Sequence, residues 1–151
     1  MNKQVRISRS SKWLTGIIGW MAPLNKFRTW FLAAAIYNLG WGLVVAFFPN
    51  LLFEILKMPA SNYPSLMGAI GMMVGVYAIG YALIWKDPER FGPLVYVGLA
   101  GKVLGPLGFL AAAIQGQLPW RFGWINVFND VVWLPAFIWF AWFVYHQENL
   151  R

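Results

Sequence analysis

The chain has 151 residues, of which 60% are apolar and only 11% are charged. This charged share is less than half of the roughly 25% that soluble globular domains carry. Four stretches contain almost no ionised side chain, and each is long enough to cross roughly 30 Å of hydrocarbon at about 1.5 Å per residue. These features exclude a soluble globular protein. They predict an all-α fold, an integral membrane bundle of four transmembrane helices.

Residue usage also excludes several kinds of site. The sequence has no cysteine, so disulfide exchange, thiolate-ligated metals and iron-sulfur clusters are excluded. The single histidine, His146, excludes a haem held by two histidines of one chain. A hydrolase nucleophile needs a nearby base, and the four stretches contain no histidine and no carboxylate pair. We therefore assign no catalytic residue and no metal site, and no cofactor is identifiable.

Residues 1–28 form a basic N-terminal segment with an apolar run that is too short to span a membrane. Trp13, Ile17, Trp20 and Leu24 recur at the spacing of one helix face. This pattern predicts an amphipathic helix that lies in the membrane interface. A signal peptide is the competing interpretation, but no small-x-small cleavage site follows the run.

A four-span transmembrane domain is expected over residues 29–146, followed by a short tail over 147–151. The predicted spans are residues 30–48, 65–85, 92–114 and 124–145. Tryptophans mark their ends, as amphipathic rings prefer the membrane interfaces. Trp30 and Trp85 are placed at the inner boundary, and Trp120 and Trp124 at the outer one.

Basic residues are distributed unequally between the two sides of this plan. Two basic residues, Lys57 and Arg121, fall in the connections on one side. Nine fall on the other side: Lys3, Arg6, Arg9, Lys12, Lys26, Arg28, Lys86, Arg90 and Arg151. The positive-inside rule therefore predicts that both termini are cytoplasmic. Basic clusters beside a span attract anionic lipid, so we expect the lipid bilayer, and not nucleic acid, as the partner of this net charge of +7.

Small residues form a stripe on one face of the second and of the third span. The stripes contain Gly71-x-x-x-Gly75 and Gly101-x-x-x-Gly105. This spacing lets two helix backbones approach closely in lipid. We expect the two stripes to face each other within one chain; a homodimer face and a groove for a flat ligand are the alternatives.

Lys102 and Asp130 are the two ionisable side chains inside the predicted spans and away from their ends. Each costs about 2.5–3.5 kcal/mol at mid-helix, so each is a functional hypothesis by default. The long lysine stem can reach outward toward the aspartate by snorkelling. We expect an ion pair or a water-linked pair, with a purely structural role in helix pairing as the alternative.

Polar neighbours and two prolines surround these charges. Pro106 and Pro135 each free the carbonyl four residues earlier, that of Lys102 and that of Val131. A freed carbonyl in lipid needs a partner or a cavity. We therefore predict a polar pocket inside the membrane. Its expected residues are Asn38, Trp41, Tyr77, Lys102, Asn126, Asn129, Asp130 and Trp133.

Several runs of residues resemble an uncharacterised family of short bacterial four-span membrane proteins. These runs are Tyr37–Gly42, Phe48-Pro49, Ile70–Tyr77, Gly101–Phe109 and Asn129-Asp130. The resemblance covers roughly residues 30–145, and it implies a bacterial inner-membrane protein without supplying a reaction. In size and topology only, the plan is also similar to DoxX-like four-helix membrane proteins. The basic N-terminal extension departs from the shorter pattern.

Three functions fit these observations. The leading expectation is a non-enzymatic membrane protein. It would be either an accessory subunit of a larger membrane complex or a binder of a lipid-like or isoprenoid molecule, such as a lipid, quinone or carotenoid. The first alternative is a small oligomeric transporter or channel that uses Lys102 and Asp130. The second is a membrane isomerase in which Asp130 serves as the acid or base. Other membrane subunits or further copies of the chain are the expected protein partners.

Overall fold

The computed structural model describes residues 24–148, and within that range it is an all-α bundle. Four segments are long and apolar enough to cross a membrane, so the protein is a multi-pass membrane protein. They are Arg28–Phe47, Pro64–Lys86, Leu94–Ile114 and Trp120–Gln147. These segments agree with the four predicted spans. The predicted interfacial helix, apart from Leu24, and the last three residues of the tail lie outside the described residues.

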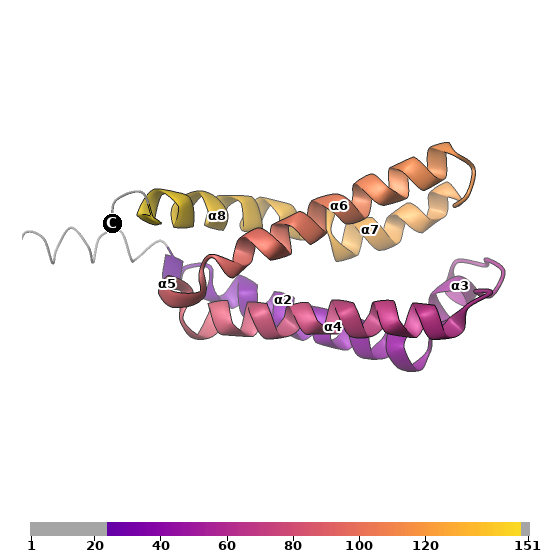
Figure 1. The fold of residues 1–151 in the computed structure, drawn as a ribbon, viewed down its shortest axis with the longest axis horizontal. Helices are drawn as coiled ribbons and strands as arrows, with labels where there is room; N and C mark the ends of the chain where they lie inside the picture. Colours follow the sequence, from indigo (N-terminus) through magenta and orange to yellow (C-terminus); the bar gives the residue numbers. More distant parts are fainter. Residues whose placement is uncertain (1–23, 149–151) are drawn as a thin grey trace, which may run out of the picture.

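Two hairpins make up the bundle (Figure 1). The first hairpin comprises α2 (Arg28–Phe47), α3 (Leu51–Ile55) and α4 (Pro64–Lys86). The second comprises α6 (Leu94–Ile114), the 3-10 turn η1 (Trp120–Phe122), α7 (Gly123–Asn129), the 3-10 turn η2 (Val131–Trp133) and α8 (Leu134–Glu148). The short helix α5 (Pro88–Phe91) joins them, and Asp87 caps it by accepting a hydrogen bond from the backbone N–H of Arg90 at 3.1 Å. One end of the bundle therefore carries α5 and the other carries α3.

Glycines bring α2 and α4 into backbone contact. A Cβ atom on Gly42 would lie 2.7 Å from the Cα atom of Gly75 and 2.8 Å from the carbonyl oxygen of Gly71. A Cβ atom on Gly71 would lie 2.6 Å from the backbone nitrogen of Ala46. The small-residue stripe of the second span thus packs on the first span. The prediction that it faces the stripe of the third span is wrong.

Tyrosine side chains from α4 occupy the space beside the stripe of α6. A Cβ atom on Gly98 would lie 2.7 Å from the ring of Tyr81, and one on Gly101 would lie 3.1 Å from the hydroxyl of Tyr77. The stripe pattern identified close approach correctly but not the partner. Small residues admit either a backbone or a large side chain, and spacing does not distinguish the two.

The main cluster of buried apolar side chains lies toward the α5 end. Its residues come from the segment just before α2 and the first half of α2, the end of α4, the start of α6 and the second half of the fourth span. They are Leu24, Phe27, Phe31, Ala34, Ala35, Tyr81, Ile84, Val95, Trp133, Phe137, Phe140, Ala141 and Val144. Toward the α3 end the two hairpins diverge (Figure 1). There Arg121 donates a hydrogen bond to the backbone carbonyl of Lys57 at 2.9 Å, which connects the two hairpins.

Candidate functional site

The fourth span is broken in its middle. Helix α7 ends at Asn129, Asp130 has non-helical backbone angles of φ −124° and ψ −59°, and α8 begins at Leu134. Pro135 explains this break, because it cannot donate to the carbonyl of Val131 and its ring clashes with that carbonyl. The break places Asp130 and the last carbonyl groups of α7 beside α6.

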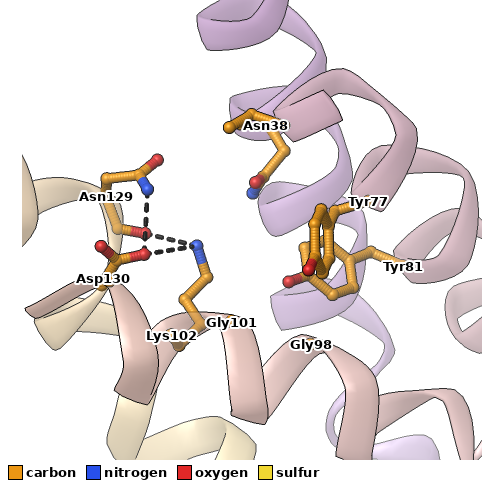
Figure 2. Close-up of a pocket in the computed structure, with 10 residues that line it drawn as sticks. Asn38, Tyr77, Tyr81, Gly98, Gly101, Lys102, Asn129 and Asp130 are labelled. Carbon is orange, nitrogen blue, oxygen red and sulfur yellow. Dashed lines mark hydrogen bonds and ion pairs between the residues drawn. The ribbon is translucent and has the colours of Figure 1, made fainter. Parts of the chain in front are cut away.

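The side chain of Lys102, from α6, points toward this break (Figure 2). Its Nζ atom lies 3.5 Å from Oδ1 of Asp130 and donates a hydrogen bond to the backbone carbonyl of Asn129. The side chain of Asn129 donates to the same Oδ1 at 2.9 Å. Lys102 and Asp130 are only 3% and 6% exposed. The predicted ion pair is therefore present. The ammonium also interacts favourably with the C-terminal end of α7, where the helix dipole is negative.

Gly105 makes room for this arrangement. A Cβ atom at this position would lie 2.9 Å from Oδ2 of Asp130. The carboxylate therefore rests against the backbone of α6, one turn beyond Lys102. Gly105 therefore leaves space for the side chain of Asp130, and not for the backbone of a second helix.

A cavity of about 180 Å³ lies beside the ion pair, between the two hairpins. We call it the central pocket. It is lined by Asn38, Val74, Tyr77, Tyr81, Gly98, Gly101, Lys102, Gly105, Asn129 and Asp130. Figure 2 shows the ion pair on one side and the two tyrosines with Asn38 on the other. All four membrane-spanning segments contribute to the lining.

Five of the eight predicted pocket residues meet in this cavity: Asn38, Tyr77, Lys102, Asn129 and Asp130. Asn38 is 2% exposed, and its Nδ2 atom donates to the carbonyl of Ala34 at 2.9 Å.

Three predicted residues do not line the central pocket. Trp41 stacks on Tyr37 with ring centroids 6.5 Å apart. Trp133 lies in the apolar core, and its indole N–H donates to the carbonyl of Phe128 at 3.1 Å. Asn126 lines a separate groove. The prediction assumed an unbroken helix, whereas the break after Asp130 places Trp133 in the apolar core; Asn126 stays on the face of Asp130, since both side chains lie beside Gly105.

Tyr81, Val74 and Gly98 also line the central pocket but were absent from the predicted set. Tyr81 lies four residues after Tyr77, so helical spacing alone places it on the same face. Its role depends on Gly98, which leaves space for its ring. This combination of a tyrosine with a facing glycine is the signal that could have identified it.

Several polar groups of the central pocket have hydrogen-bonding capacity left. The Oδ1 atom of Asn129 is buried and has no hydrogen-bond partner among residues 24–148. A lysine ammonium has three donors, and the bonds of Lys102 to described residues use two of them. Buried polar groups rarely stay unpaired. The pocket can therefore hold a small molecule that both donates and accepts hydrogen bonds.

Metal binding gains no support from the described part of the chain, where no three His, Asp or Glu side chains gather into a ligand set. Comparison of the sequence with protein-family models and with curated proteins, and of the structure with solved structures, found no match.

Proposed function

We propose that this protein binds a lipid-like small molecule in the central pocket. The observation that carries the proposal is the Lys102–Asp130 pair, which is buried at mid-membrane depth and forms one wall of a cavity with unused hydrogen-bonding groups. Ionisable residues inside a membrane are costly and mark functional sites by default. A ligand that completes their hydrogen bonds would offset part of that cost.

A binding site explains the distribution of polar groups better than a pore. Pores need a polar lining along their length or rings of charge. In the described chain the charged pair and its polar neighbours gather at one depth. Toward the α3 end the helices present large exposed apolar side chains instead, such as Leu66, Leu107 and Leu110. Catalysis has less support, because Asp130 is already paired with Lys102 and no second carboxylate and no histidine of the described residues lines the pocket.

The pocket-filling substitution Val74→Phe tests the proposal. Val74 lines the pocket, and its apolar side chain takes no part in the hydrogen bonds of the ion pair. A phenylalanine here is therefore expected to fill the space of the ligand and to leave the fold intact. Val76→Phe is the matched control, because Val76 lies on the same helix and is 63% exposed. The measurement is mass spectrometry of organic extracts from protein purified out of its own membrane in a mild detergent.

We expect one non-phospholipid species in about stoichiometric amount with the wild-type protein and the Val76→Phe variant. In the Val74→Phe variant it should fall at least about tenfold, a loss of about 1.4 kcal/mol or more in binding free energy. Equal retention in both variants, or extracts that contain only bulk phospholipid, would contradict the proposal.

We further propose that both termini are cytoplasmic in a bacterial inner membrane. The excess of basic residues beside the α5 end supports this orientation, and the bacterial origin depends on the family resemblance. The chain has no cysteine, so single cysteines can be placed without background. Asn62→Cys, before α4, should react with a membrane-impermeant maleimide in intact spheroplasts. Glu89→Cys, in α5, should react only after permeabilisation, and the reverse pattern would overturn the orientation.

A further inference from the structure

The chemistry of the central pocket defines the class of molecule that it accepts, if the proposed binding function holds. We propose that the ligand is a neutral lipid with a compact head that carries a hydroxyl group, and that this head enters sideways from the bilayer. Four observations support the proposal: the charge of the pocket, its unused hydrogen-bonding groups, its volume and its position.

Charge comes first. Lys102 and Asp130 are opposite charges 3.5 Å apart, and within residues 24–148 no other ionisable Lys, Arg, Asp or Glu lines the pocket. The pocket is therefore neutral as a whole. An anionic head would compete with Asp130 for the ammonium and leave one negative charge buried without a partner. That arrangement is strongly unfavourable in a low-dielectric site.

The unused hydrogen-bonding groups match a hydroxyl. Lys102 offers one remaining N–H donor, and Oδ1 of Asn129 is a buried acceptor with no partner among the described residues. A hydroxyl can accept the hydrogen bond that Lys102 offers and, after a small shift of the buried Asn129 side chain, donate one to its oxygen. A pure acceptor, such as an ester carbonyl, would leave the Asn129 oxygen unsatisfied at a cost of about 1–3 kcal/mol.

Volume and position favour a compact head over the head of an ordinary phospholipid. The cavity of about 180 Å³ is smaller than the roughly 300–1,000 Å³ of pockets that enclose a whole small molecule. Lys102 lies near the middle of α6, about 12 Å along the helix from Leu94 at 1.5 Å per residue. Phospholipid heads stay at the membrane surface, whereas neutral lipids with one small polar group can place it at this depth.

Entry from the side follows from the asymmetry of the packing. The aromatic core closes the α5 side of the pocket, with Phe31 and Phe137 fully buried beside Tyr81. Toward the α3 end the hairpins diverge (Figure 1), and Gly105 at the pocket is exposed. Described side chains beyond it on α6 are apolar and exposed, including Leu107 and Leu110. An alkyl tail can therefore extend toward the α3 end in contact with the surrounding lipid.

Photolabelling with three matched probes tests the head group. The probes are hexadecanol, hexadecanoate and hexadecyl phosphate, each with a diazirine close to the head, added to the full chain in phosphatidylcholine nanodiscs. We expect hexadecanol to label peptides of α4 and α6 around Tyr77 and Gly105 saturably, at least about tenfold above the two anionic probes. Val74→Phe should abolish this labelling, and Val76→Phe should leave it unchanged.

Two outcomes would overturn the inference, and they are distinguishable. Saturable labelling of the same peptides by hexadecanoate or hexadecyl phosphate, removed by Val74→Phe, would contradict the neutral head and leave the binding function standing. Labelling by all three probes that neither saturates nor responds to Val74→Phe would report lipid contact only. Together with extracts that contain no stoichiometric ligand, that result would contradict the binding function as well.

Discussion

Replacement of Gly42 by alanine is expected to separate α2 from α4 and to lower the free energy of unfolding by about 3 kcal/mol, the upper part of the usual range for overpacking. The added methyl carbon would lie 2.7 Å from the Cα of Gly75. Backbone atoms cannot rotate away as a flexible side chain can, so the whole helix must shift. Gly71→Ala should have a similar effect, because its methyl would lie 2.6 Å from the nitrogen of Ala46.

Two glycines supply controls for this prediction. On Gly75 a Cβ atom would have its nearest neighbour, the Cα of Gly42, at 3.9 Å, and on Gly40 it would meet nothing within 4 Å. Alanine at either position should be neutral or stabilising by up to about 1 kcal/mol, from its higher helix propensity. Equilibrium unfolding in mixed detergent micelles measures all four variants. Equal stability of Gly42→Ala and Gly40→Ala would contradict the packing of the first hairpin.

The Lys102–Asp130 pair should show strong energetic coupling. Lys102→Met removes the ammonium that compensates a carboxylate only 6% exposed, and it is expected to cost about 3–5 kcal/mol in unfolding free energy. Asp130→Asn leaves the lysine with the carbonyl of Asn129 and should cost less. The double variant carries no charge at the site, so it should recover at least about 2 kcal/mol relative to the sum of the single changes.

A double-mutant cycle from the same unfolding measurements gives this coupling. Lys86→Met replaces Lys102→Met in the control cycle with Asp130→Asn. Lys86 suits this purpose because it is exposed at the end of α4 and forms no ion pair with a described residue. Additive single effects would show that the two charges act independently, contrary to their 3.5 Å separation.

The double variant also separates the structural role of the pair from its proposed role in binding. It should fold but fail to retain the ligand, because the Lys102 donor that faces the pocket is lost. If it kept a stoichiometric ligand, the pair would serve helix packing alone, and the binding account would need another polar anchor.

The four spans could be predicted from sequence because their signal is chemical and local. Length and the near absence of charge identify a membrane helix without knowledge of its neighbours. The Lys102–Asp130 pair was also predictable, since a buried charge requires a partner and only one of each sign lies inside the spans.

The partners of the glycine stripes could not be predicted in the same way. Gly71 packs on a backbone, whereas Gly101 packs on the hydroxyl of Tyr77, although both belong to G-x-x-x-G patterns. Whether a glycine packs on a backbone or on a side chain depends on which large side chains the opposing helix carries at the level of that glycine. That information is tertiary, and a spacing rule for one helix does not contain it.

The break at Asp130 explains why Trp133 does not line the central pocket. Pro135 was recognised as the cause of a freed carbonyl, but the change in helix direction that follows was not. A continuous helix would place Asn126 and Trp133 on one face with Asp130. The interrupted helix instead turns Trp133 into the apolar core and presents Asp130 and the carbonyl of Asn129 to Lys102.

Ligand binding in the central pocket can be tested by an experimental structure of the protein purified from its own membrane in a mild detergent. We expect density of one small molecule in the central pocket, within hydrogen-bonding distance of Lys102 Nζ and Asn129 Oδ1. Its tail should extend toward the α3 end between the two hairpins. A pocket collapsed onto the ion pair, with the tyrosine hydroxyls bonded to Lys102 or Asp130 and no space for a ligand, would contradict this expectation.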